Sequence, residues 1–175
     1  MAEQTAQQIP GHVLSAFQLD GRAGIPLGPE WDNGVRFGRV VVSEASGTAA
    51  WSGKARDHAG EFGAGIAVSR PVRATDGRLV VGGFKASEFV EGRVLARIDE
   101  AVSAALRYDE AMASVDAPTA DRGDAFATAE RAVWRDYAPQ ADDVVAHMDF
   151  ASCLLFSGDM VPTLTDLVPS SGKRP

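Results

Sequence analysis

The sequence predicts an α+β protein, and three observations carry that prediction. Short apolar runs bounded by turn residues fill the first half of the chain, a pattern typical of an antiparallel sheet. Helical periodicity then dominates residues 97–115 and 124–137. A hairpin-like pattern follows between residues 153 and 167, so a strand-rich part precedes a helix-rich part, which is the order expected of an α+β fold.

The composition is that of a folded protein. The chain has 175 residues, 45% hydrophobic and 23% charged, which is enough for one domain or two small lobes. Its net charge of −7 argues against an extended nucleic-acid-binding face, because phosphate contacts need clustered Lys and Arg. No apolar run reaches the length of a membrane span, and residues 1–12 lack the basic and apolar regions of a signal peptide. We therefore expect a cytoplasmic protein with neither nucleic-acid nor membrane partners.

The first half is expected to form a sheet with one longer helix. The expected elements are a short helix, two strands, a longer helix and two further strands, at residues 12–17, 31–42, 47–62, 66–72 and 78–84. The run Thr75-Asp76-Gly77 is a turn signal between the last two strands.

Two helices are expected in the second half. In residues 97–115 an apolar stripe, interrupted by Asp109, is formed by Ile98, Val102, Ala105, Leu106 and Met112. Residues 124–137 place Phe126, Ala129, Val133 and Tyr137 on one side of a second helix. For both helices we expect the apolar side to pack in the core.

Acidic residues stand in the largely apolar stretch from 144 to 169. Asp159 belongs to a turn signal, whereas Asp149 and Asp166 each follow a strand-like run. A carboxylate at the end of a buried strand is costly unless it is paired, hydrogen-bonded or bound to a cation. Between these two aspartates, residues 153–156 and 161–167 predict the arms of a hairpin, and Cys153 in its apolar run is expected to be a buried, inert thiol.

This stretch resembles the catalytic segment of kinase-like phosphotransferases, in which an H-x-D-x-x-x-x-N loop and a hairpin lead to a second, metal-binding Asp. His147-Met148-Asp149 matches the start of the loop, and Leu164-Thr165-Asp166 supplies the second Asp. The whole succession of elements is similar to aminoglycoside phosphotransferases. It is closer still to a family of uncharacterised actinobacterial proteins related to them, with the block from Arg70 to Gly92 as the most specific part.

The resemblance implies a protein-kinase-like fold of two lobes with a truncated C-lobe. Residues 1–92 would form an N-lobe of mostly antiparallel sheet with one helix. Residues 93–175 would form a partial C-lobe of two helices and the catalytic-loop-like hairpin. The C-terminal helices that close the substrate side of aminoglycoside phosphotransferases are absent, so a protein partner is expected to cover the apolar surface left exposed.

The resemblance also implies roles for particular residues, with ATP and Mg²⁺ as possible cofactors. Asp149 would be the base for the hydroxyl of a small-molecule acceptor, His147 would orient the loop, and Asp166 would hold Mg²⁺. The backbone of the hinge between the lobes would meet the adenine ring, and its residues are Phe89, Val90 and Glu91.

The sequence departs from the phosphotransferase pattern at two groups that act on the phosphates and the metal. Ser43 stands where a strand Lys would hold the phosphates, and the nearest replacement cations in sequence are Lys54 and Arg39. Leu154 stands at the Asn of the catalytic loop and has no side-chain group for a metal.

Three functions remain open on the sequence. The first is a degenerate pseudokinase that acts as a binding or regulatory protein. The second is an active ATP-dependent phosphotransferase for small molecules. The third is a small α+β interaction domain without a nucleotide site, whose two aspartates are turn and strand-end residues.

Overall fold

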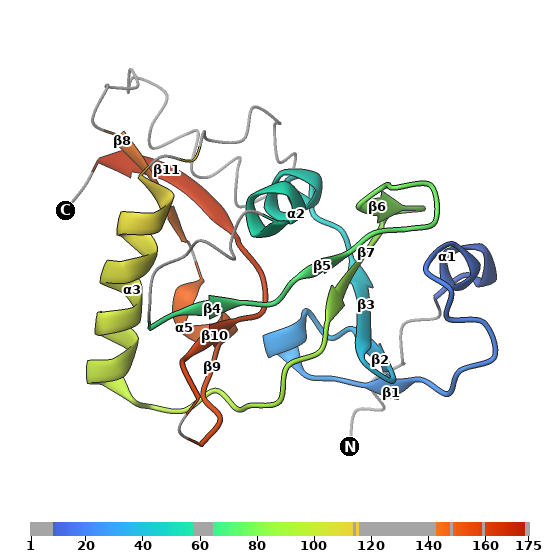
Figure 1. Ribbon diagram of the computed structural model, residues 1–175, viewed down its shortest axis with the longest axis horizontal. Coiled ribbons are helices and arrows are strands. Elements are labelled where there is room, and N and C mark those ends of the chain that lie inside the picture. Colours follow the sequence, from blue (N-terminus) through green and yellow to red (C-terminus); the bar gives the residue numbers. More distant parts are fainter. Residues whose placement is uncertain are drawn as a thin grey trace.

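The computed structural model describes residues 9–57, 65–113, 115, 143–147, 149–158 and 160–173, and it shows a mixed α+β protein (Figure 1). The main sheet has six strands, in the order β1-β2-β3-β7-β5, with β6 also paired to β7. Its strands are β1 (Ile25–Pro26), β2 (Val35–Phe37), β3 (Val40–Glu44), β5 (Pro71–Val72), β6 (Val80–Val81) and β7 (Phe84–Glu88).

Two smaller sheets complete the strands of the described residues. In the first, β10 (Thr163–Leu164) pairs antiparallel with β9 (Leu154–Leu155) and parallel with β4 (Ala67–Val68). The second consists of β8 (Asp143–His147) and β11 (Pro169–Lys173), which are antiparallel. The β9–β10 pairing confirms the hairpin predicted between residues 153 and 167.

The helices are short apart from α3 (Ile98–Met112), which matches the helix predicted at residues 97–115. The others are α1 (Gly11–Ala16), the 3₁₀ helix η1 (Pro29–Trp31), α2 (Ala49–Asp57) and α5 (Phe150–Cys153). The helix predicted at residues 124–137, and the last residues of the one predicted at 47–62, lie outside the described residues. Within the described part, no helix is both long and apolar enough to cross a membrane.

Strand β7 is the centre of the main sheet. It pairs antiparallel with β3, with Ser43 opposite Lys85, and its first four residues are buried. On its other side β7 pairs with both β5 and β6. Ser43 stands where the strand Lys was expected, and the residue directly opposite it, Lys85, is a buried Lys.

The prediction that residues 66–72 and 78–84 form two strands joined by a turn is only partly right. The turn is present, since the backbone N–H of Ala74 donates to the carbonyl of Arg78 at 2.9 Å. The strands beside it, however, pair with β7 and not with each other, while β4 joins the sheet of β10. The reason is a tighter turn at Gly82-Gly83, where φ is 56° and 82°, values that a two-residue hairpin turn requires and that glycine adopts without strain.

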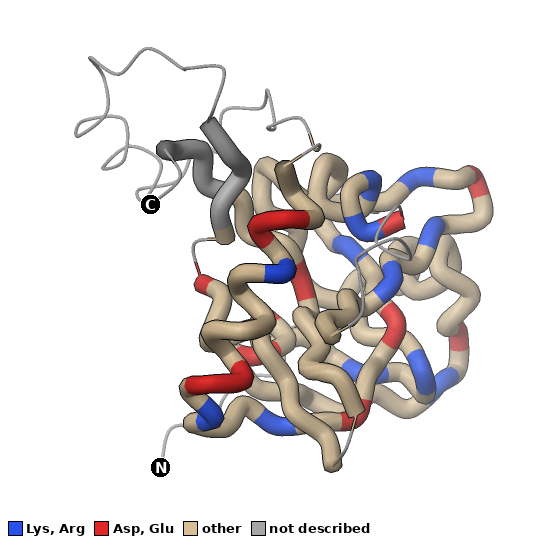
Figure 2. The backbone as a smooth tube through the Cα atoms, turned by 60° about the vertical axis from the view of Figure 1, so that its left-hand side comes forward, with Lys and Arg blue, Asp and Glu red and all other residues tan. Residues whose placement is uncertain are grey.

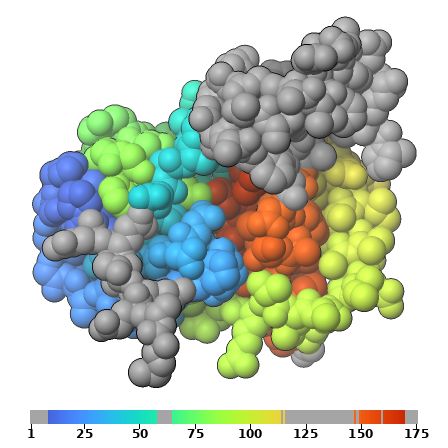
Figure 3. Space-filling model, turned by 180° about the vertical axis from the view of Figure 1, so that it is seen from behind, coloured from blue at the N-terminus to red at the C-terminus, as the bar shows by residue number. Residues whose placement is uncertain are grey.

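The prediction that the apolar stripe of α3 packs in the core is wrong for three of its residues. Ile98, Val102 and Leu106 are 72%, 55% and 63% exposed. The buried side of the helix is instead a neighbouring stripe, which has the same spacing of four residues and consists of Ala104, Tyr108 and Met112. In the view from behind, the yellow and yellow-green surface at the right-hand edge belongs to α3 and the segment before it (Figure 3).

Three apolar clusters hold these elements together. One is formed by residues of α1 and the main sheet and includes Val13, Val42 and Phe84. A second packs α2, α3 and the β9–β10 hairpin, and a third joins Trp31 and Val41 to Leu155. The third cluster therefore connects β3 of the main sheet with β9 of the hairpin.

Candidate functional site

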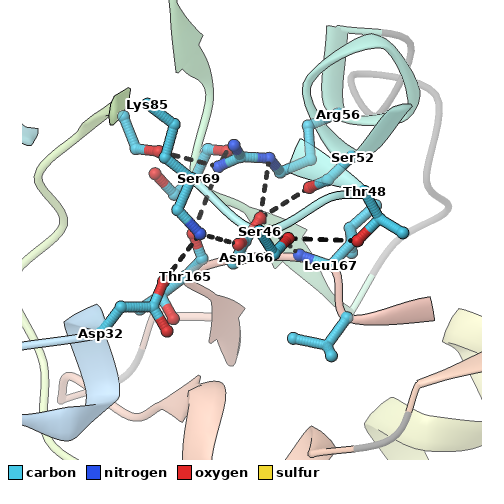
Figure 4. Close-up of polar contacts among 12 residues, drawn as sticks. Asp32, Ser46, Thr48, Ser52, Arg56, Ser69, Lys85, Thr165, Asp166 and Leu167 are labelled. Atoms are coloured by element: carbon cyan, nitrogen blue, oxygen red, sulfur yellow. Dashed lines mark hydrogen bonds and ion pairs between the residues drawn. The ribbon is translucent and has the colours of Figure 1, made fainter. Parts of the chain in front are cut away.

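The carboxylate of Asp166, two residues beyond β10, is the centre of a buried polar cluster (Figure 4). Its Oδ1 accepts hydrogen bonds from Ser52 Oγ at 2.6 Å and from the backbone N–H of Leu167 at 2.8 Å. The Nε of Arg56 lies 3.5 Å from the same oxygen. The other oxygen, Oδ2, forms an ion pair and hydrogen bond with Lys85 Nζ.

Helix α2 supplies two of these partners from one face. Ser52 and Arg56 are four residues apart, so both side chains point to the same side of the helix. The Nη1 atom of Arg56 donates to three acceptors at 2.9–3.3 Å, namely Ser69 O, Ser87 Oγ and Thr165 O. Its Nε has no hydrogen-bond partner among the described residues, so this N–H acts on Asp166 through its charge alone.

Lys85 reaches the cluster from β7 and also contacts a second carboxylate. Its Nζ lies 2.7 Å from Oδ2 of Asp32, which follows η1 and adopts a left-handed conformation with φ of 53°. The Lys85 side chain is 7% exposed and that of Asp32 is 45% exposed. Two cations, Lys85 and Arg56, thus face two carboxylates, Asp32 and Asp166, and the formal charges cancel.

The charges of the cluster shift the pKa values of its central pair in opposite directions. Burial opposes ionisation of Asp166, but the positive charges of Lys85 and Arg56 outweigh it and hold the pKa of the carboxyl well below its usual range. Burial also opposes the charge on Lys85, and the carboxylates of Asp166 and Asp32 outweigh it, so the pKa of Lys85 lies above 10.5. Both groups are therefore charged at neutral pH.

The backbone before Asp166 is fastened on two sides. The hydroxyl of Thr165 donates to the carbonyl of Glu30 at 2.7 Å, and its N–H donates to the carbonyl of Cys153 at 3.0 Å. Leu164 is completely buried. These contacts hold the end of β10 between η1 and the β9 arm, which aims the Asp166 side chain at α2 and β7.

His147, at the end of β8, contacts the backbones of both Asp149, the predicted base, and Asp166, the predicted metal ligand. Its Nδ1 accepts the N–H of Asp149 at 3.1 Å, so the neutral ring carries its hydrogen on Nε2 and donates it to the carbonyl of Asp166 at 3.0 Å. The N–H of Val168 also lies 3.3 Å from Nε2. Burial lowers the pKa of His147 below 6.5, which favours this neutral form.

Asp149 itself is an exposed residue at the N-cap of α5, without a side-chain capping bond. The structure therefore brings Asp149 and Asp166 together through His147, one carboxylate facing solvent and the other enclosed. No described group of three or more His, Cys, Asp or Glu side chains is arranged to hold a metal ion.

The predicted hinge, Phe89 to Glu91, leaves the main sheet directly after β7. The ring of Phe89 is stacked on Trp31 with centroids 5.5 Å apart, and the guanidinium of Arg36 lies 3.6 Å from its centroid. Arg36 also pairs with Glu91 at 3.7 Å, an exposed contact that contributes little to stability. Both the aromatic ring and the carboxylate of this segment are thus engaged by neighbouring side chains.

A narrow cavity opens beside the cluster and has room for about one water molecule. It is lined by Trp31, Asp32, Val41, Ser43, Lys85, Ser87, Thr165 and Asp166. In this arrangement a Mg²⁺ ion does not fit at Asp166, since protein donors already take both oxygens of the carboxylate.

The two cations that the sequence suggested as replacements for the strand Lys do not lie beside Asp166. Lys54 and Arg39 are exposed and outside the cluster, and Lys85 and Arg56 supply its positive charges instead. Two signals point to them: a Lys inside a strand that is otherwise apolar or small, and a polar pair four residues apart on a helix. Neither signal identifies Asp166 as the partner.

No protein-family model matches the sequence, and a comparison with curated proteins finds no match. The kinase-like resemblance therefore depends on the residues quoted for it in the sequence.

Proposed function

We propose that this chain is a kinase-like, aminoglycoside phosphotransferase-related pseudoenzyme with a two-lobe fold, which acts in the cytoplasm by binding a protein partner. The observation that carries the proposal is that both carboxylate oxygens of Asp166 are engaged by protein groups. Of the roughly four lone-pair positions of a carboxylate, three accept hydrogen bonds, from Ser52, Lys85 and the Leu167 backbone. The charge of Arg56, whose Nε lies 3.5 Å from Oδ1, adds a second cation.

This engagement of Asp166 matters because phosphoryl transfer depends on metal ions and cations that neutralise the phosphates. A carboxylate that already compensates two buried cations cannot take up Mg²⁺ without leaving one of those cations unpaired, which is costly in the interior. Asp166 thus serves here as the counter-ion of Lys85 and Arg56. Together with Leu154 at the Asn position of the loop, this favours a protein that no longer catalyses the reaction.

The exposed side of α3 supports a partner. Ile98, Val102 and Leu106 form an uncovered apolar stripe, and Val94 and Leu95 before the helix are 46% and 43% exposed. Acidic residues stand near both ends of the helix, Asp99 and Glu100 in the first turn and Asp109 and Glu110 towards the end (Figure 2). Exposed apolar residues gathered on one face with charges around them are typical of a protein interaction site.

One observation favours the second candidate, an active ATP-dependent phosphotransferase that acts on a small-molecule acceptor. Lys85 lies directly across from Ser43, so a cation is present in the region where the strand Lys is missing. This candidate requires Lys85 to leave Asp166 for the phosphates, with Asp149 as the base. The third candidate, an interaction domain without any nucleotide site, shares the partner surface with the pseudoenzyme.

The test measures the thermal unfolding midpoint of the purified protein at increasing concentrations of ATP and Mg²⁺. An Asp166→Ala variant is titrated in the same way. A ligand that binds only the folded state raises the unfolding midpoint. We expect no magnesium-dependent rise in the unmodified protein. A rise that needs magnesium and disappears in the variant, together with phosphoryl transfer that is lost in Asp149→Ala, would establish the active enzyme and overturn the proposal.

A further inference from the structure

The ammonium group of Lys85 lies between two carboxylates that come from distant parts of the chain (Figure 4). Asp32 approaches from the turn after η1 and Asp166 from the end of β10, and one oxygen of each, Oδ2, contacts Nζ. The remaining donors of the cluster act on the other oxygen of Asp166. Oδ2 of Asp166 and Oδ2 of Asp32 therefore share a single cation, and that cation is a side chain of the protein.

The surroundings of this ammonium have the chemistry of a site for a hard divalent cation. Apart from Lys85 and the indole of Trp31, the polar side chains that line the adjoining cavity present oxygen atoms, in the carboxylates of Asp32 and Asp166 and the hydroxyls of Ser43, Ser87 and Thr165. Ca²⁺ and Mg²⁺ prefer oxygen ligands, and Mg²⁺ is commonly held by one or two carboxylates with water completing its shell. The Nζ–Oδ2 distance to Asp32, 2.7 Å, is only slightly longer than the roughly 2.3–2.6 Å of Ca²⁺–oxygen bonds.

The position of Lys85 explains how one residue fills this place. In the register of β3 and β7, Lys85 is opposite Ser43, whose short side chain leaves room for the longer one. The pairing of β3 with β7 thus places the ammonium of Lys85 between the two carboxylates. Because the Lys is covalently attached and 7% exposed, a free cation must compete with a group that is always present at the site.

We propose that Lys85 is a tethered cation that occupies a divalent-cation site formed by Asp32 and Asp166. In the unmodified protein the ammonium excludes metal from the site. Without the ammonium, the same two carboxylates bind Ca²⁺ or Mg²⁺. The inference deepens the proposed function, because it identifies the residue that withdraws Asp166 from metal binding, and it adds Asp32 as a second ligand.

The experiment measures the binding of CaCl₂ and MgCl₂ by calorimetry and by thermal unfolding, without nucleotide, at constant ionic strength. The unmodified protein is compared with Lys85→Ala, with Lys85→Ala/Asp32→Asn, and with Lys54→Ala as a matched control. Lys54 is an exposed Lys of α2, so its loss changes the net charge equally but leaves the cluster intact. Circular dichroism checks folding in each case.

We expect Lys85→Ala alone to bind a divalent cation, with about one ion per chain. Its unfolding midpoint should rise by roughly 5–10 °C when the ion is at a hundredfold excess over the dissociation constant. The double variant should lose this binding, and the unmodified protein and Lys54→Ala should show none.

Several results would overturn the inference: a folded Lys85→Ala protein that binds neither ion, binding that survives Asp32→Asn, or equal binding by the unmodified protein. If Lys85→Ala is unfolded without metal, the inference requires Ca²⁺ or Mg²⁺ to restore its fold, and failure of both ions to do so counts against it. The nucleotide titration of the unmodified protein decides the proposed function separately, so the two can fail independently.

Discussion

Replacing Asp166 by Asn removes one negative charge from the buried cluster while keeping the size of the side chain. Lys85 keeps the half-exposed Asp32 as a partner, but Arg56 keeps only neutral acceptors. The charge of the cluster changes from balanced to an excess of one positive charge, on residues whose side chains are 1% and 7% exposed. We therefore expect a large loss of stability from a substitution that deletes no carbon atom.

The magnitude follows from the burial of the partners that remain. Breaking a buried ion pair by removing one member costs about 3–5 kcal/mol, because the other member is left uncompensated. Domains are stabilised by only about 5–15 kcal/mol in total. With a urea dependence of about 2 kcal/mol per molar, the midpoint of unfolding should fall by roughly 1.5–2.5 M.

The assay is urea unfolding followed by circular dichroism at neutral pH. A matched control is Asp57→Asn, which breaks an ion pair with Arg73 whose side chains are 34% and 48% exposed and should change the free energy of unfolding by less than about 1 kcal/mol. A second comparison is Asp166→Asn/Lys85→Met, which restores charge balance between Arg56 and Asp32. We expect this double variant to be less destabilised than the sum of the two single changes.

The pH dependence gives an independent readout of the same carboxylate. Because the folded-state pKa of Asp166 is lowered, its contribution to stability is complete above the ordinary value near 3.8 and is lost as the pH falls below that value towards the folded-state pKa. The unmodified protein should show this acid-induced loss, and Asp166→Asn should lack it. Two results together would refute the buried-cluster reasoning. Asp166→Asn would be destabilised by less than about 1 kcal/mol at unchanged urea dependence, and both proteins would lose stability in acid to the same extent.

Further predictions test other parts of the structure. Because burial lowers the pKa of His147, its contribution is complete above pH 6.5 and declines as the pH falls through the folded-state pKa, so His147→Gln should flatten the stability profile below pH 6.5. Burial raises the pKa of Cys153 to about 12, so a thiol reagent should modify it in the native protein much more slowly than in urea. In Gly34→Ala the added Cβ would lie 2.7 Å from a backbone carbonyl oxygen, which should cost roughly 1–3 kcal/mol in urea unfolding, whereas Gly11→Ala, with nothing within 4 Å, should be harmless. Because Val102 is exposed, Val102→Ser should change the free energy of unfolding by less than about 0.5 kcal/mol in the same assay. A larger loss would show that Val102 packs in the core.

Local patterns in the sequence were enough for several elements. The periodicity of residues 97–115 predicted α3 to within a few residues at each end, and the apolar arms around residues 153–167 predicted the β9–β10 hairpin. Both depend on interactions between neighbours along the chain. The side of α3 that is buried was predicted wrongly, because two apolar stripes overlap on the helix and only packing against Tyr108 and Met112 selects between them.

The sequence by itself determined that Asp166 needs compensation, since a carboxylate at the end of a buried strand is costly when left alone. Only the tertiary structure decided what compensates it. Ser52 and Lys85 are 114 and 81 residues away along the chain, and they meet Asp166 because α2 packs near the sheet and because β7 pairs with β3. The electrostatic energy of two charges depends on the distance between them in space and not on their separation in the sequence. The partners of a buried charge can therefore be identified only when the register of the strands is known.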